Sequence, residues 1–305
     1  MLVPALDLLR QARQQKYAVP AFNVNNLEIL KAVMAAAEEL KSPVIVQTSE
    51  GAIDYAGMDY LIALVSVAAK AYIPVVLHLD HGKDLDLIKE AIDSGYTSVM
   101  FDGSYLPYDL NAKNTKMVVA WARAKGVSVE AELGRIVGQE DFVDVKSWEA
   151  ALTDPEEAAR FVKETGCDTF AVAIGTAHGA YKFKGETHLD IERLKKIERL
   201  VKNPLVLHGA SGVLEDIVDL AEHYGAELVE ARGTLDEDIK QAIKHGVAKI
   251  NIDTDLRLAF TAGIREAVAE LPKVIDPREI LKPAMKLMTE VAKRKIKLFG
   301  SEGKA

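Results

Sequence analysis

Short apolar runs alternate along the whole chain with longer segments of helical period. Eight runs are interpreted as strands because they are brief, apolar and rich in β-branched residues; they lie at 18–24, 44–50, 75–81, 98–103, 128–134, 169–175, 204–209 and 247–253. The segments between them place apolar residues three and four positions apart, as amphipathic helices do. Eight such units in 305 residues predict an α/β fold, a (β/α)8 TIM barrel, as a single domain over residues 1–305.

Several helix boundaries have clear signals. Asp154 and Asp276 each precede a proline, the arrangement of an N-cap followed by Pro at the first helical position. The segment 210–246 is too long for one connection and should hold helices near 214–223 and 235–245. Residues 277–298 should form an extra C-terminal helix outside the barrel, with "KRKIK" (293–297) as its solvated end. A doubly wound sheet is the main rival fold, but no GxGxxG follows the first strand, which disfavours a dinucleotide-binding version.

Charge and cysteine content narrow the class of protein. The net charge of −8 argues against a nucleic-acid or anionic-membrane partner. Cys167 is the only cysteine, so an intrachain disulfide is impossible and a reducing compartment is expected. The first fifteen residues lack a signal-peptide pattern, and no apolar run approaches the roughly 18–20 residues of a membrane span. We therefore expect a cytoplasmic protein.

The dipeptide His–Gly follows three of the apolar runs. The copies are His81–Gly82, His178–Gly179 and His208–Gly209. The C-terminal ends of barrel strands meet at one rim, so three imidazoles there can converge on one metal ion and leave a position open, as catalytic zinc requires. A fourth copy, His245–Gly246, precedes a strand and is interpreted as a helix end, so position and not the dipeptide indicates the metal site.

Strand parity complicates the first of these histidines. His78 and Asp80 share one face of their strand, whereas His81 lies on the other. Parity alone would pair His78 with Asp80. A residue at the end of a strand can leave the pleat, so His81 could still turn inward.

Inward-facing charges occur on two further strands. Glu130 and Glu132 alternate on one face of 128–134, with Glu132 nearer the mouth and plausible as a metal ligand. On 247–253 the face that holds Lys249, Asn251 and Asp253 should point into the barrel. Lys249 has two open interpretations, an internal salt bridge with Glu130 or a Schiff-base lysine.

Two glycine-bearing turns follow strands at the same rim. "GTAHG" (175–179) and "GASG" (209–212) offer backbone N–H groups that can bind an anion, and the second turn leads into a helix whose dipole would help. Ser211 would add a hydroxyl donor. Because barrels often bind phosphate after their seventh and eighth strands, we predict a phosphate site here.

Together these residues resemble a known family. "LHLDHG", "EAELG", "AIGTAHGAYK", "LVLHGASG" and "KINIDTDLRLAF" occur in this order at barrel-like spacing. They resemble the class II, metal-dependent fructose-1,6-bisphosphate aldolases over roughly residues 1–300. The tagatose-bisphosphate aldolases share most of these motifs, and "NIDTDLRLAF" looks more like the fructose branch.

The resemblance implies a metal site and two proton-transfer groups. His81, His178 and His208 would hold the catalytic zinc, or another divalent transition metal such as cobalt, and Asp102 and Glu132 would match positions that bind a second or displaced metal. Asp80 would be the acid/base at the carbon-4 hydroxyl of the sugar. Glu140, in the loop 134–144 that resembles the family's mobile active-site loop, would move the proton on the dihydroxyacetone phosphate carbon.

The resemblance also implies substrate contacts and an assembly. The residues that would line the ketose bisphosphate are Asn23, Ser49, Gly179, Lys182, Gly209, Ser211, Asn251, Asp253 and Thr254. Arg257 would reach a phosphate in a neighbouring subunit's site, in a homodimer or homotetramer. The implied reaction is the reversible cleavage of fructose 1,6-bisphosphate to dihydroxyacetone phosphate and glyceraldehyde 3-phosphate, a step of glycolysis and gluconeogenesis. A monovalent cation is a further candidate ligand.

Four alternatives stay open at this point. Tagatose 1,6-bisphosphate differs from the fructose sugar only at carbon 4. A lysine-based aldolase would use Lys249, and a metal-dependent barrel hydrolase would use a metal-bound water. A non-catalytic metal- or sugar-phosphate-binding protein would bind the sugar and release no triose phosphate.

Overall fold

The computed structural model describes residues 1–134, 137–140, 143–145, 152–178, 188–228 and 233–305. For residues 137–140, 143–145 and 177–178 it describes the backbone alone.

Eight parallel strands close into a barrel, as the strand pattern predicts. They are β1 (Val19–Asn23), β2 (Val44–Ser49), β3 (Val75–Gly82), β4 (Ser98–Phe101), β5 (Ser128–Leu133), β8 (Thr169–Val172), β10 (Leu205–Leu207) and β11 (Val247–Ile252). Their order around the barrel is β1-β11-β10-β8-β5-β4-β3-β2, and β1 closes the ring by pairing with both β2 and β11. The TIM-barrel prediction is confirmed at every strand.

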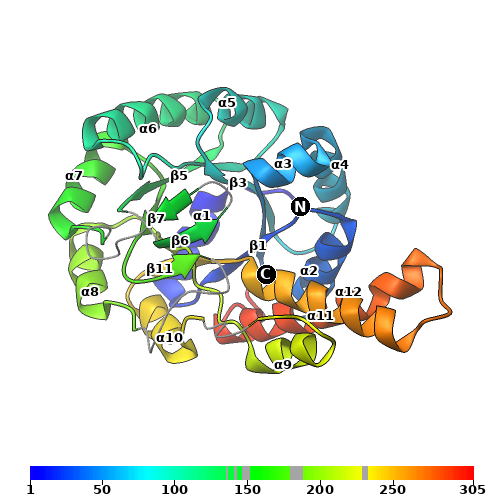
Figure 1. Cartoon of the computed structure of the whole chain (residues 1–305). Helices are drawn as coiled ribbons and strands as arrows, with labels where there is room; N and C mark the ends of the chain where they lie inside the picture. The colour runs from blue at the N-terminus through cyan, green and yellow to red at the C-terminus, as the bar shows by residue number, and fades with distance from the viewer. Residues whose placement is uncertain (135–136, 141–142, 146–151, 179–187, 229–232) are drawn as a thin grey trace.

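Helices surround the barrel and close one end of it (Figure 1). They are α1 (Ala5–Gln15), α2 (Leu27–Glu39), α3 (Glu50–Ala56), α4 (Met58–Ala68), α5 (Leu85–Ser94), α6 (Tyr108–Arg123), α7 (Pro155–Thr165), α8 (Ile191–Leu200), α9 (Glu215–His223), α10 (Asp236–Lys244), α11 (Thr254–Glu270) and α12 (Pro277–Leu298). The two helices predicted within 210–246 are confirmed as α9 and α10, and the extra C-terminal helix as α12. Asp154 and Asp276 cap α7 and α12 as expected. None of the described helices alone could span a membrane; α3 and α4 reach the required length and hydropathy only together, across a bend of 97°.

The barrel interior is apolar at one end and polar at the other. At the N-terminal ends of the strands, Val19, Ile45 and Val76 pack in one buried cluster with Leu9 of α1. Further along the same strands the inward positions, which recur every two residues, become polar: Gln47 on β2, His78 on β3 and, after Ala21, Asn23 on β1. The polar end is the mouth at which barrel enzymes place their chemistry.

The segments that follow β5 and β8 form a small sheet that the sequence did not predict. It consists of β6 (Val137–Glu140), β7 (Val143–Val145) and β9 (Ala177–His178). β6 pairs antiparallel with β7 and parallel with β9. The segment interpreted as a loop, 134–144, thus contains a strand, β6, that pairs with β9 forty residues further along the chain, and local periodicity cannot reveal such a pairing.

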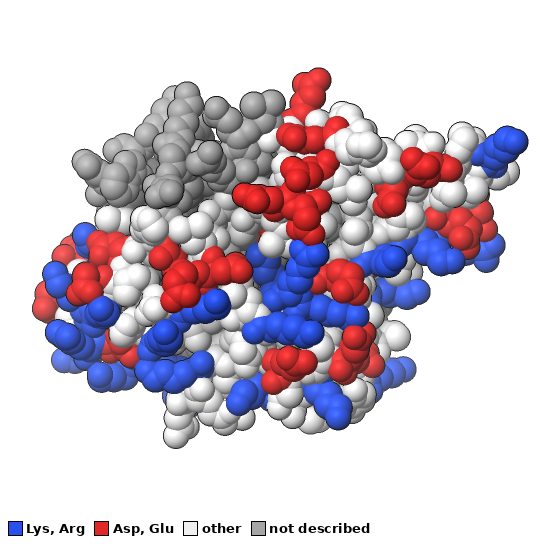
Figure 2. Space-filling model, turned by 90° about the horizontal axis from the view of Figure 1, so that it is seen from below, with Lys and Arg blue, Asp and Glu red and all other residues white. Residues whose placement is uncertain are grey.

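The interpretation of "KRKIK" as a solvated helix end is wrong for Lys295, whereas Lys293 and Arg294 keep part of their side chains exposed and form ion pairs. Lys295 is 2 % exposed, and its Nζ lies 2.9 Å from Asp255 Oδ2. Lys293 pairs with Glu39 of α2, and Arg294 pairs with Asp216 of α9. Acidic and basic side chains are interspersed on the face around these helices (Figure 2). The end of α12 is therefore tied to three other elements of the fold.

Candidate active site

The end of β3 turns two side chains toward the same place. His81 has φ of +48°, in the left-handed region that non-glycine residues rarely occupy. The pairing of β3 with β4 shifts register between Leu79 and Gly82. His81 therefore leaves the strand pleat and turns inward beside Asp80, as the parity argument allowed. His78 is also buried inside the barrel.

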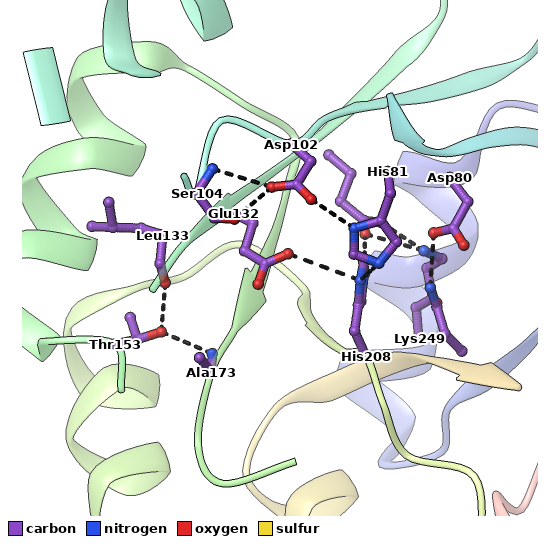
Figure 3. A network of polar contacts seen from close by, with 12 residues as sticks. Asp80, His81, Asp102, Ser104, Glu132, Leu133, Thr153, Ala173, His208 and Lys249 are labelled. Carbon is purple, nitrogen blue, oxygen red and sulfur yellow. Dashed lines mark hydrogen bonds and ion pairs between the residues drawn. The ribbon is translucent and has the colours of Figure 1, made fainter. Parts of the chain in front are cut away.

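The imidazoles of His81 and His208 face each other across the mouth of the barrel (Figure 3). His208 Nδ1 lies 2.7 Å from His81 Nε2, and the rings meet edge to face with centroids 4.5 Å apart. Each outer nitrogen lies beside a carboxylate: His81 Nδ1 is 2.8 Å from Asp102 Oδ2, and His208 Nε2 is 2.7 Å from Glu130 Oε1. Carboxylates accept these N–H bonds, so both inner nitrogens present lone pairs to the same point.

Two lone pairs at this separation repel each other unless a cation lies between them. Burial lowers the pKa of His81, but the carboxylates of Asp80 and Asp102 outweigh burial and raise it to about 10. Burial and the charge on His81 hold the pKa of His208 well below its usual value. A proton or a divalent cation at this point would relieve the repulsion between the two nitrogens, and the two would compete for it. The donor set fits a metal ion.

Three carboxylates surround this pair. Asp80, His81 and His208 offer ligand atoms within 4.8 Å of one another, and so do His81, Asp102 and Glu132. Glu132 Oε2 is buried without a hydrogen-bond partner among the described residues and lies 3.9 Å from His208 Nδ1. An unsatisfied buried carboxylate oxygen at this position is what a second metal position would use. Four of the five predicted metal ligands therefore converge.

The remaining predicted residues of this mouth lie outside the described side chains. His178 ends β9 and Glu140 ends β6, but only their backbones are described. Gly179 and Lys182 lie outside the described residues altogether. Their roles stay predictions.

The Asp80 carboxylate is buried and held by three side-chain amides. Asn251 Nδ2 donates to Oδ1 at 2.9 Å, and Asn23 Nδ2 and Gln47 Nε2 donate to Oδ2 at 3.0 and 3.1 Å. Burial alone would raise the pKa of Asp80, but His81 and Lys249 lower it below its usual value. Asp80 is therefore an ionised carboxylate that three amide groups hold in one orientation. Gln47 was missed by sequence reasoning, although its place on the inward face of an apolar strand was the available signal.

Lys249 forms the internal salt bridge that the sequence left as one of two interpretations. Its Nζ lies 2.9 and 3.1 Å from the two oxygens of Glu130, and both side chains are 1 % exposed. The same nitrogen lies 3.4 Å from His78 Nε2. Burial, followed by the charge on Lys249, holds the pKa of His78 well below its usual value, so that ring is neutral. An ammonium group fixed by a buried carboxylate is a poor nucleophile, which disfavours a Schiff base.

The predicted phosphate turn lies at the end of β10. Gly209 has φ of +60°, and Ser211 is buried. Gly212 N donates to Asp255 Oδ2 at 2.9 Å, so the turn is tied to the first turn of α11. The start of that helix, Thr254, lies at the C-terminal end of β11, where its dipole favours an anion.

The other predicted substrate residues make local contacts. Ser49 Oγ accepts from Ala52 N at 3.2 Å and caps α3. Arg257 binds Asp253 with two contacts of 2.9 and 2.7 Å, while its side chain remains half exposed. Its reach into a neighbouring subunit stays a prediction.

Comparison with known proteins identifies the family. The model of the family described as fructose-bisphosphate aldolase class-II matches residues 3–304. The fructose-bisphosphate aldolase of Thermus caldophilus is 51 % identical over 305 residues and covers 100 % of both chains. That of Giardia intestinalis is 49 % identical over 303 residues, which is 98 % of this chain and 93 % of the other. The solved YdjI aldolase from Escherichia coli K12 superposes with a TM-score of 0.79 at 37 % identity and 100 % coverage of both chains. The chain therefore belongs to the class II fructose-bisphosphate aldolases, a family of metal-dependent lyases.

Proposed function

We propose that this chain, as one catalytic domain over residues 1–305, reversibly cleaves fructose 1,6-bisphosphate to dihydroxyacetone phosphate and glyceraldehyde 3-phosphate with a bound Zn²⁺. The observation that supports this most directly is the buried, ionised Asp80 beside two imidazoles whose inner nitrogens are 2.7 Å apart. A base and a cation site placed side by side are what cleavage between a hydroxyl-bearing carbon and a carbon next to a carbonyl requires.

The donor set favours zinc, with cobalt as the other candidate. His81 Nε2 and His208 Nδ1 would be two ligands, and His178 is proposed as the third. Imidazole ligands suit zinc and other late transition metals better than Mg²⁺ or Ca²⁺. Asp102 and Glu132 would hold a second or displaced metal position. When bound, the metal supplies Lewis-acid stabilisation of the negative charge that develops on the substrate oxygens.

Asp80 would start the cleavage. Its carboxylate takes the proton of the carbon-4 hydroxyl, and the bond between carbons 3 and 4 breaks. Asn23, Gln47 and Asn251 keep the carboxylate ionised and aimed at one point, since each donates an N–H to it. Glu140 would then supply the proton to the carbon of dihydroxyacetone phosphate. The condensation uses the same groups in reverse.

The glycine turns and the start of α11 would hold the substrate. Backbone N–H groups at these places favour phosphate. The residues proposed to line the sugar phosphate are Ser49, Gly179, Lys182, Gly209, Ser211, Asp253 and Thr254. A homodimer or homotetramer would bring Arg257 of one subunit to a phosphate in the next, and a bound monovalent cation is part of the same proposal. The substrate, and the single reduced cysteine, fit a cytoplasmic enzyme of glycolysis and gluconeogenesis.

A coupled triose phosphate assay with fructose and tagatose bisphosphates tests the proposal. We expect rapid turnover of the fructose sugar, loss of that turnover in EDTA and its return with Zn²⁺. Preference for the tagatose sugar would reassign the substrate. Activity that survives EDTA would overturn the metal mechanism, and hydrolysis of esters without triose phosphate release would favour the barrel hydrolase.

A further inference from the structure

A buried ion pair lies directly behind the predicted phosphate turn. Lys295 of α12 and Asp255 of α11 are 2 % and 0 % exposed in their side chains, and Nζ lies 2.9 Å from Oδ2. The same Oδ2 accepts the N–H of Gly212 at 2.9 Å. Asp255 Oδ1 has no hydrogen-bond partner within the part of the chain that the structure describes. Lys295 is therefore the cation that compensates a carboxylate in contact with the turn.

The turn begins at a glycine with positive φ and is followed directly by a strained residue. Val213, a β-branched residue, has φ of +49°, and Gly209 has φ of +60°. Thr234 N donates to Ser211 O at 3.0 Å, so a second segment also holds the turn. A Cβ on Gly212 would lie 2.8 Å from Lys295 Nζ. Strained conformations persist only where several contacts impose them. The Lys295–Asp255 pair supplies one of these contacts, because Asp255 accepts the N–H of Gly212.

A close contact between two helices fixes where Lys295 lies. A Cβ on Gly263 of α11 would lie 2.4 Å from both Cα and N of Ala284 in α12, so the two backbones touch at this point. From there α12 continues toward the start of α11, where Asp255 lies. On α12 the buried residues Met288, Val291, Ala292, Lys295 and Ile296 form one stripe of helical period. The Lys295 ammonium group therefore lies on the buried, mostly apolar face of α12.

We propose that Lys295 is a positioning residue for phosphate binding: it neutralises Asp255 behind the turn 209–212 and thereby fixes the turn in the conformation that receives a substrate phosphate. This proposal rests on the proposed function in one respect: it assumes that a substrate phosphate binds at Ser211. Without Lys295 an unpaired carboxylate would lie against the turn and repel a phosphate dianion. The C-terminal helix, which lies outside the barrel, would then take part in substrate affinity.

The test compares charge variants of the zinc-loaded enzyme at fixed ionic strength. Lys295→Met is compared with Lys297→Met, which removes the same charge from an exposed position of the same helix. Asp255→Asn and the double variant Lys295→Met/Asp255→Asn complete a cycle. The readouts are the Kd of inorganic phosphate by calorimetry and the split of KM against kcat for fructose 1,6-bisphosphate.

We expect Lys295→Met to raise both the phosphate Kd and KM by roughly tenfold, the size of losing one charge near a partly buried anion, with kcat within about threefold. The double variant should recover most of the affinity, Asp255→Asn should bind phosphate at least as tightly as the parent, and Lys297→Met should match the parent. If Lys295→Met does not fold, the phosphate Kd of Asp255→Asn tests the proposal by itself.

The proposal would be overturned by an unchanged phosphate Kd in Lys295→Met, or by a loss of phosphate affinity in Asp255→Asn equal to that expected for the lysine variant. A double variant that is as weak as Lys295→Met would likewise reduce the pair to a structural role. Failure of the proposed function is distinguishable, because the parent protein would then bind phosphate without cleaving the sugar.

Discussion

Replacing Lys249 by Met removes the only described cation within hydrogen-bond distance of Glu130. The ammonium group lies 2.9 and 3.1 Å from the two carboxylate oxygens, and both side chains are 1 % exposed. After the change, Glu130 would keep its contact with His208 at 2.7 Å but would lose its charge partner. Met has a similar length and no charge, so the variant separates charge from volume.

Breaking a buried pair by removing one partner costs about 3–5 kcal/mol, because the remaining charge stays buried without compensation. An unfolding entropy of about 2.1 cal/mol/K per residue converts this into a fall in Tm of roughly 5–8 °C for a chain of this length. A second effect concerns the metal. Lys249 is one of the groups, after burial and His81, that lower the pKa of His208. The same positive charge repels a metal ion, so without Lys249 both the proton and Zn²⁺ should bind that ring more strongly, and zinc affinity should fall more steeply than in the parent as the pH is lowered.

Calorimetric Tm and a zinc competition titration at two pH values measure both effects. The double variant Lys249→Met/Glu130→Gln removes both charges and keeps an acceptor for His208, so it should recover part of the lost stability. A Tm for Lys249→Met within about 2 °C of the parent, less than half the expected shift, would refute the charge argument. Borohydride reduction in the presence of substrate provides an independent check, and a covalent adduct at Lys249 would restore the Schiff-base alternative.

Three further predictions follow from other parts of the structure. Asp80→Ala should retain its metal but lose about 10²–10⁴-fold in kcat, as for other acid/base groups, and near-normal turnover would remove Asp80 from this role. Burial raises the pKa of Cys167 to about 12, so the thiol stays protonated below that pH; a chromogenic disulfide reagent at pH 8 should label one thiol per chain in denaturant and none in the folded protein. Gly263→Ala should destabilise the fold by about 1–3 kcal/mol in denaturant titrations, because the added methyl group meets the α12 backbone; unchanged stability would contradict that helix contact.

The sequence predicted the barrel well because strand and helix periods are local properties. Each of the eight strands is confirmed, and the polar residues at their ends converge where barrel topology requires. The inward turn of His81 could only be left open, since it depends on a left-handed backbone at a register shift in β3. Strand alternation does not encode that departure from the pleat.

The misses have different physical origins. β6 and β9 pair across forty residues of chain, and no local pattern indicates such a partner. Lys295 was interpreted as solvated because it lies in a basic run, although it also falls on the buried stripe of α12. Periodicity was the stronger signal there, because a buried lysine requires only one acidic partner, which Asp255 supplies. Gln47 was also missed because its position was not weighed: it is a polar residue on the inward face of a strand that begins with an apolar run, and it donates to Asp80.

The central claim is that His81 and His208 bind one divalent cation through the two nitrogens that face each other, His81 Nε2 and His208 Nδ1. Anomalous diffraction at the zinc edge from crystals of the zinc-loaded protein tests it most directly. The account predicts one strong peak at about 2.0–2.1 Å from both His81 Nε2 and His208 Nδ1. A peak bonded only by carboxylates, or no peak between the two rings, would contradict it.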